Sequence, residues 1–134
     1  MAVRKAVVIS FMGLAGCAGT VHVPGDLKPG ANESLAMVVP ARGVQIYECR
    51  DTKWAFVAPE AELYDANGKR IGRHYAGPHW EAADGSRIVA TLSKVTSIQR
   101  VATTGGVAPA GGCSQAGTQA RVPYTADYDF FATK

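Results

Sequence analysis

The clearest hydrophobic pattern in the chain is a strict alternation over residues 121–130. One set of alternating positions is apolar or aromatic: Val122, Tyr124, Ala126, Tyr128 and Phe130. The positions between them are mainly polar: Arg121, Pro123, Thr125, Asp127 and Asp129. Because successive side chains of a β-strand point to opposite faces, this period of two predicts a strand with one face against a core. Pro123 places the pattern at a sheet edge or at the start of the strand.

Shorter apolar runs predict further strands over residues 44–49, 54–57 and 95–101. Asn67-Gly68 and Asp84-Gly85 each lie between two strand-like runs, which is typical of a β-hairpin turn. After the first twenty residues, no segment combines helical periodicity with helix caps. Several short strands separated by turns predict one all-β domain over residues 35–134, an antiparallel β-sandwich or barrel. The pattern alone does not choose between these two forms of closure.

The N-terminus has the pattern of a targeting signal. Arg4 and Lys5 precede an uncharged, mostly apolar stretch over residues 6–14, which is too short for a helix to cross a hydrocarbon core of about 30 Å. The following Leu14-Ala15-Gly16-Cys17 resembles a bacterial lipobox, in which the cysteine is acylated and becomes the first mature residue. We therefore expect a lipoprotein signal peptide over residues 1–16 and lipidation at Cys17. An ordinary signal peptide, cleaved after Ala18, is the alternative.

Lipidation would tether the protein to a membrane. Ala18 after the cysteine resembles the outer-membrane sorting signal of Gram-negative lipoproteins, so the expected location is the bacterial cell envelope, on the periplasmic side of the outer membrane. Secretion is the alternative location. Residues 17–34 contain Pro24, Gly25, Pro29 and Gly30, and this composition predicts a tether that leads to the domain.

Size and charge exclude several classes of protein. A chain of 134 residues has room for one domain, so it is too small for a TIM barrel or a two-domain dehydrogenase. The net charge of +3 includes Arg4 and Lys5, and without the signal peptide 12 basic residues face 11 acidic ones. A nearly neutral mature chain has no basic footprint for a nucleic acid, so nucleic acid is not an expected partner.

The remaining two cysteines, Cys49 and Cys113, predict a disulfide, because an even pair in an oxidising compartment is normally bonded. It would close a loop of about 65 residues, which the chain-entropy description values at about 4 kcal/mol. A metal-binding or catalytic role for either cysteine is less favoured. The chain has no Cys-X-X-Cys motif, and neither cysteine has a histidine close by in sequence.

Distinctive motifs resemble the DUF3455 family, whose members are secreted bacterial and fungal proteins without an established function. The motifs span residues 43–49 (GVQIYEC), 72–81 (GRHYAGPHWE), 98–101 (IQRV) and 122–128 (VPYTADY). The resemblance runs from about Pro40 to Phe131 and implies export of the protein. Family members usually carry additional residues between the Asp-Gly-Ser turn and the Ile-Gln-Arg strand. Their absence near Ala90 suggests an internal deletion of one strand and loop.

The densest group of polar and aromatic residues contains the candidate ligand-binding residues His74, Tyr75, His79, Trp80 and Glu81. If Trp80 points inward, His79 and Glu81 share the opposite face of their strand. His74, His79 and Glu81 would then supply nitrogen and oxygen ligands for a metal ion, although their spacing matches no known zinc motif. The structural alternative is hydrogen bonding of His74 and Tyr75 across a turn, with Trp80 in the core.

No catalytic motif accompanies this group, so catalytic residues and cofactors are not expected. Ser86 lies in Asp-Gly-Ser rather than in a nucleophile elbow, and no glycine-rich dinucleotide fingerprint follows a strand. Arg100 on a predicted strand is a candidate for anion binding, with an exposed or paired arginine as the alternative. The favoured function is a non-enzymatic module that binds a small molecule or a protein. The alternative is a small periplasmic metal-binding protein or enzyme centred on His74, His79 and Glu81.

Overall fold

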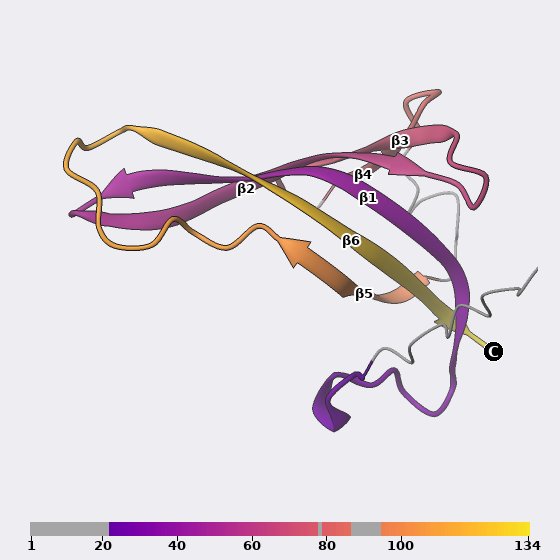
Figure 1. Cartoon of the computed structure of the whole chain (residues 1–134). Helices are drawn as coiled ribbons and strands as arrows, with labels where there is room; N and C mark the ends of the chain where they lie inside the picture. The colour runs from indigo at the N-terminus through magenta and orange to yellow at the C-terminus, as the bar shows by residue number, and fades with distance from the viewer. Residues whose placement is uncertain (1–21, 78, 87–94) are drawn as a thin grey trace, which may run out of the picture.

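The computed structural model describes residues 22–77, 79–86 and 95–134, and almost all regular structure in them is β-strand (Figure 1). A single 3-10 turn, η1 (Gly25–Leu27), precedes six strands: β1 (Glu33–Arg50), β2 (Lys53–Tyr64), β3 (Arg70–Tyr75), β4 (His79–Ala82), β5 (Val95–Gly105) and β6 (Gln119–Thr133). In these ranges no helix is long and apolar enough to cross a membrane. The expected signal peptide, Cys17 and the apparent deletion near Ala90 lie outside the described residues.

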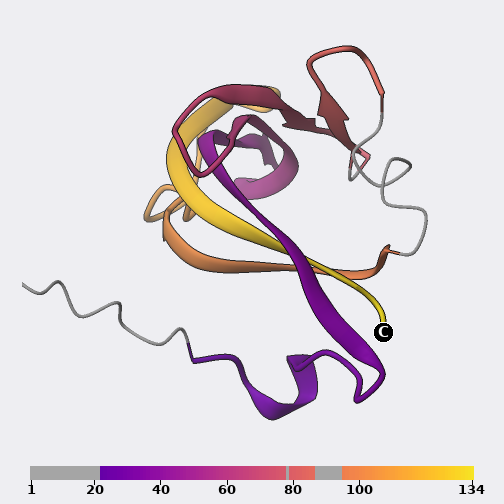
Figure 2. The same ribbon diagram turned by 90° about the vertical axis from the view of Figure 1, so that its right-hand side faces the viewer.

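The strands form one antiparallel sheet in the order β4-β3-β2-β1-β6-β5, which confirms the predicted all-β class. The longest strand, β1, lies near the middle and pairs with both β2 and β6. Figure 2 shows the sheet curling strongly around its own axis. Its edge strands, β4 and β5, are not hydrogen-bonded to each other, so the sheet is rolled like a barrel but is not closed.

The core fills the concave face of this rolled sheet. It contains residues of the three central strands: Val39 and Ala41 of β1, Ala61 and Leu63 of β2, and Tyr124, Ala126, Tyr128 and Phe130 of β6. The predicted alternation in β6 is confirmed, since its four core residues are buried and the positions between them are more exposed. Trp80 of β4 and Ile98 of β5 pack against the same cluster. Curling therefore brings both edges of the sheet to one core.

Pro123 was expected at a sheet edge or at the start of a strand, but it is the fifth residue of β6, which lies second from the edge, between β1 and β5. The neighbouring β5 ends at Gly105, opposite Tyr124. Beyond that point the Gly106 N–H donates to the Pro123 carbonyl at 2.9 Å, and proline has no N–H to return. The Tyr47 hydroxyl donates to the Gly106 carbonyl instead, at 2.6 Å. A side chain thus replaces the missing backbone donor.

Two glycines allow strands to approach more closely than side chains would permit. A Cβ atom added to Gly43 of β1 would lie 2.0 Å from the Glu60 carbonyl oxygen, and one added to Gly72 of β3 would lie 2.1 Å from that of Glu81. Both contacts are with backbone atoms, which cannot swing aside. Glycine at such positions is typical of strands that bend sharply.

Both predicted turns are present. The Asn67-Gly68 turn joins β2 to β3, and the Asp65 carboxylate accepts the N–H groups of Asn67 and Lys69, each at 2.9 Å. In the Asp84-Gly85 turn the Asp84 carboxylate accepts the Ser86 N–H at 2.9 Å. The strand expected after this second turn lies outside the described residues.

A ladder of polar side chains crosses the convex face of the sheet. Each member pairs in register with the next: Glu81, Arg73, Glu62, Arg42, Thr125 and Thr104, one from every strand. Arg73 and Glu81 form an ion pair at 2.8 Å, and the two threonine hydroxyls lie 2.5 Å apart. Exposed ion pairs add little stability, but opposite charges on facing positions favour one strand register over a slipped one.

The predicted disulfide between Cys49 and Cys113 is confirmed. Cys49 is buried near the end of β1, and Cys113 lies in the glycine-rich segment between β5 and β6. Backbone hydrogen bonds support the link: Cys113 N–H donates to the Thr52 carbonyl at 3.0 Å, and Gly117 N–H donates to that of Cys49 at 3.0 Å. The disulfide therefore fastens the long β5–β6 connection to the β1–β2 hairpin.

The close approach at Gly43 predicts a large effect of a single methyl group. We expect Gly43→Ala to lower the free energy of unfolding by about 1 to 3 kcal/mol, the range typical of an overpacked site. Urea unfolding followed by circular dichroism measures this change. Gly25→Ala is the matched control, because a Cβ atom there meets no heavy atom within 4 Å. Equal stabilities of the two variants would contradict this account of the sheet's curvature.

Candidate functional site

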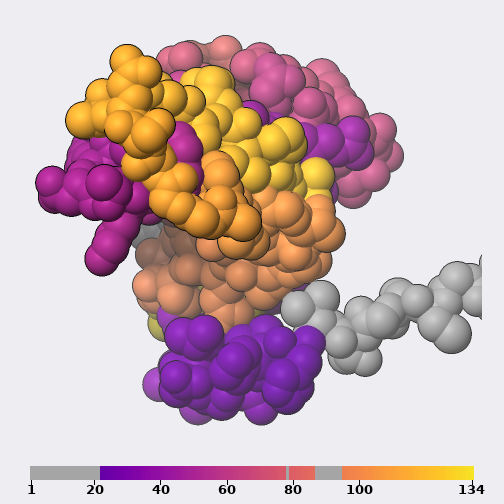
Figure 3. All heavy atoms as spheres, turned by 60° about the vertical axis from the view of Figure 1, so that its left-hand side comes forward, coloured from indigo at the N-terminus to yellow at the C-terminus, as the bar shows by residue number. Residues whose placement is uncertain are grey.

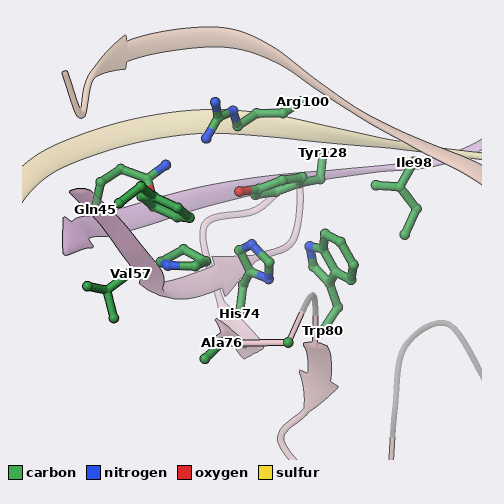
Figure 4. A pocket seen from close by; sticks show the side chains of 11 residues that line it. Gln45, Val57, His74, Ala76, Trp80, Ile98, Arg100 and Tyr128 are labelled. Atoms are coloured by element: carbon green, nitrogen blue, oxygen red, sulfur yellow. The ribbon is translucent and has the colours of Figure 1, made fainter. Parts of the chain in front are cut away.

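A cavity of about 360 Å³ opens on the concave side of the sheet, next to the core (Figure 4). All six strands or their turns contribute to its lining, which consists of Gln45, Phe56, Val57, Pro59, His74, Ala76, Gly77, Trp80, Ile98, Arg100 and Tyr128. Most of these side chains are apolar or aromatic. The volume lies in the range of sites that hold small molecules.

A β-bulge in β2 shapes one side of the cavity. Ile46 pairs with Ala58 and Tyr47 pairs with Phe56, which leaves Val57 without a partner on β1. An extra residue of this kind bends its strand and redirects the side chains around it. Phe56 and Val57 both border the cavity and remain 54% and 40% exposed. They form an accessible apolar wall.

His74 is held firmly among aromatic rings. It pairs with Trp80 across β3 and β4, and the two rings stack with centroids 4.4 Å apart and planes 9° apart. The ring of Tyr128 meets it edge-on at 4.9 Å. The Nδ1 atom lies 2.8 Å from the His79 carbonyl oxygen, and because that oxygen only accepts, Nδ1 must carry the proton and donate.

Burial lowers the pKa of His74, although the hydrogen bond to the His79 carbonyl acts in the opposite direction. The positive charge of Arg100 lowers this pKa further. The imidazole is therefore neutral at neutral pH. With its proton on Nδ1, the ring presents Nε2 as a hydrogen-bond acceptor.

Two buried polar atoms in the cavity lining have no hydrogen-bond partner within the described residues: Gln45 Oε1, an acceptor, and Trp80 Nε1, a donor. The Gln45 side chain is 4% exposed, so bulk water does not replace the missing partner. A buried polar atom without a partner costs about 1 to 3 kcal/mol, and most buried polar atoms in proteins are satisfied. One cavity thus holds both an unused donor and an unused acceptor.

Arg100 is the only formally charged residue of the cavity lining. It lies in β5 opposite Tyr128 of β6. The four ion pairs found among residues 22–77, 79–86 and 95–134 do not include it. The cavity therefore combines one cationic group with no carboxylate from its own lining.

The other candidate residues face away from the cavity. Tyr75 donates from its hydroxyl to Glu81 at 2.7 Å, and Glu81 also pairs with Arg73. The His79 ring stacks on Tyr75 at 5.1 Å, with Nδ1 2.6 Å from the Ala76 carbonyl oxygen. The expected alternation is therefore present: Trp80 points to the core, whereas His79 and Glu81 share the opposite face.

Strand register also separates the expected metal ligands. His74 pairs with the inward-facing Trp80, so it lies on the concave face, across the sheet from His79 and Glu81. In the part of the chain that the structure describes, no three histidine, cysteine, aspartate or glutamate side chains are grouped so as to hold a metal ion. In the described residues, His74, His79 and Glu81 therefore do not come together around a common metal site.

The cavity contains residues that the sequence did not single out, above all Gln45 and Tyr128. Gln45 shares its strand face with Tyr47 and Cys49. A polar amide among these residues is the sequence feature that could have identified it. Arg100, a candidate for anion binding, borders the cavity and is exposed, which is also what the alternative of an exposed arginine expects. The contributions of β1, β5 and β6 depend on the rolling of the sheet, which no local pattern indicates.

A second hollow, of about 640 Å³, lies between residues 22–29 and β5. Figure 3 shows the N-terminal segment against this strand. The Gln99 side-chain amide donates to the Leu27 carbonyl across the gap. Neither of the two unpartnered buried side-chain atoms in the described residues belongs to its lining, so the smaller cavity is the better candidate for a binding site.

The lowered pKa of His74 predicts a dependence of stability on pH. Below about pH 6.5, the ordinary histidine pKa, His74 becomes protonated in the unfolded chain but stays neutral in the folded protein, because its pKa is lowered there. The free energy of unfolding therefore falls as the pH falls. The slope cannot exceed about 1.4 kcal/mol per pH unit. Urea unfolding between about pH 7.5 and 5.5, above the titration of the carboxylates, measures the effect. We expect His74→Asn to remove this dependence and His79→Asn to retain it; a wild-type stability that stays constant would contradict a buried neutral His74.

Comparison with known proteins leads to one family. The family model of DUF3455, described as a protein of unknown function, matches residues 29–93 and 88–132. The two matched segments together cover most of the chain and confirm the resemblance found in its motifs. No curated protein and no solved structure matches the chain. The chain therefore belongs to the DUF3455 family of proteins of unknown function.

Proposed function

We propose that this protein is an envelope lipoprotein whose single β domain binds a small molecule in the cavity lined by His74 and Trp80. One observation carries the proposal. The buried Gln45 Oε1 and Trp80 Nε1 atoms both belong to the lining of this cavity, and both are without a partner in the described residues. Polar groups of a bound molecule would satisfy them.

The energetic argument favours binding over a purely structural role. A glutamine that is 4% exposed and leaves its carbonyl oxygen unsatisfied destabilises the free domain relative to an apolar residue of the same size. Residues that lower stability in this way are typical of functional sites. The mostly apolar walls, with a few polar groups that converge on one space, are the usual composition of a small-molecule site.

The proposed location rests on the sequence of the N-terminus. The basic residues, the short apolar stretch and the lipobox-like Leu14–Cys17 support export and lipidation at Cys17. The Cys49–Cys113 disulfide is compatible with an oxidising compartment outside the cytoplasm. In this proposal the lipid anchors the protein to a membrane, and residues 17–34 lead from the anchor to the domain.

If Gln45 is present to bind a ligand and does not stabilise the fold, replacing it should stabilise the free protein. We expect Gln45→Met to raise the free energy of unfolding by about 1 kcal/mol, because the unsatisfied amide oxygen is removed while the volume is kept. The control is Gln99→Met, which removes an amide that donates to the Leu27 carbonyl and should be neutral or destabilising. Thermal and urea unfolding measure both variants. A Gln45→Met variant less stable than the wild type would show that the amide supports the fold.

The lipid anchor has a separate test. We expect Cys17→Ser to move the protein from the membrane fraction to the soluble fraction, because serine cannot carry the thioether-linked lipid. Cell fractionation and intact-mass measurement together follow this change. The wild-type mass should exceed that of a chain starting at residue 17 by the mass of the attached lipid. Membrane association and mass that stay the same in the variant would contradict lipidation at Cys17.

A further inference from the structure

We infer that the ligand of this cavity is a small aromatic carboxylic acid that carries a hydroxyl group on its ring. The inference rests on the proposed function and adds the chemical class of the ligand. Three features of the lining carry it: an arginine without an ion pair in the described residues, a set of aromatic walls, and an unused acceptor and an unused donor at opposite ends. Each feature corresponds to one part of such a molecule.

The presence of Arg100 in the cavity lining indicates that the ligand carries a carboxylate. The Arg100 guanidinium is the only formal charge in the lining, and no lining residue carries a carboxylate. Arg100 also forms no ion pair with the described acidic residues. A guanidinium binds a planar carboxylate with two parallel hydrogen bonds, and such charge-assisted bonds are stronger than neutral ones. A cationic ligand would meet repulsion here without any compensating group.

The aromatic side chains that line the cavity indicate that the ligand contains an aromatic ring. The stacked rings of His74 and Trp80 and the edge-on ring of Tyr128 form rigid surfaces on one side (Figure 4). Phe56 and Val57 of the bulge supply the apolar wall nearer to solvent. Aromatic rings favour offset or edge-to-face contact with other rings. A volume of about 360 Å³ suits a molecule with one ring rather than a fused polycyclic compound.

The two buried atoms without a partner in the described residues, Gln45 Oε1 and Trp80 Nε1, indicate that the ligand carries a hydroxyl group. Trp80 Nε1 can only donate a hydrogen bond, and Gln45 Oε1 can only accept one. Figure 4 shows Gln45 and Trp80 at opposite ends of the cavity, so different groups of the ligand must pair with them. A hydroxyl group can donate to Gln45 Oε1, whereas any acceptor of the ligand can receive the Trp80 N–H. The neutral His74 ring adds Nε2 as a further acceptor at the same cavity. A ligand without a donor group of this kind would leave the Gln45 oxygen unpaired.

The test uses three probes that differ by one group each: 4-hydroxyphenylacetate, the neutral 4-hydroxyphenylacetamide, and phenylacetate, which lacks the hydroxyl. Calorimetry and amide chemical-shift mapping on the mature chain measure affinity and location. We expect 4-hydroxyphenylacetate to bind about tenfold more tightly than either of the other two, the difference expected from one charge-assisted or buried hydrogen bond. The shifted amides should belong to the strands around the cavity.

Two variants assign each preference to its residue. Arg100→Gln should abolish the preference for the acid over the amide but keep the preference for the hydroxylated acid. Gln45→Met should do the reverse, reducing the hydroxyl preference while the acid remains favoured over the amide. Arg50→Gln, an exposed arginine paired with Glu48 outside the cavity lining, is the matched control and should change neither preference.

The outcomes separate this inference from the function on which it rests. Equal or tighter binding of the amide would overturn the aromatic-acid class and leave small-molecule binding in place. If none of the probes shifts the cavity amides while Gln45→Met stabilises the free protein, the ligand class is wrong and the site still requires another ligand. If no probe binds and Gln45→Met is destabilising, both the class and the proposed function fail.

Discussion

A single sheet with no second layer in the described residues has only its own concave face in which to exclude water from its apolar side chains. Rolling solves this problem, because it brings β4 and β5, the two edges of the sheet, against the same cluster of central residues. The rolling needs places where the backbones approach closely. Gly43 and Gly72 provide them, since any side chain there would collide with a carbonyl oxygen of the neighbouring strand.

The curvature that buries the core also creates the cavity. The bulge at Val57 and the short β3–β4 hairpin border a space next to the stacked rings of His74 and Trp80. Rigid rings and two unpartnered polar atoms in its lining make this space different from an ordinary packing defect, which is normally apolar and dry. Rolling thus connects the stability of the domain to its proposed binding site.

The convex face of the sheet holds the strands in register. It carries a ladder of charged and hydroxyl side chains that runs in register across all six strands. Tyr75 and Glu81, which the sequence placed among candidate ligand-binding residues, belong to this face through their own hydrogen bond. Their role in the structure is to hold β3 and β4 in register, where a slip by one residue would turn His74 and Trp80 away from the core.

The amino-acid sequence by itself determined the all-β class, the two turns, the disulfide and the inward face of β6, because these depend on alternation, turn residues and cysteine count. Its motifs also indicated the family. Only the tertiary structure decided that the sheet rolls without closing, that His74 lies apart from His79 and Glu81, and that Gln45 and Arg100 line one cavity with Trp80. Local patterns report which side of a strand is buried. The distance between strands far apart in sequence depends on the curvature of the whole sheet, which arises from close backbone contacts that no local pattern records.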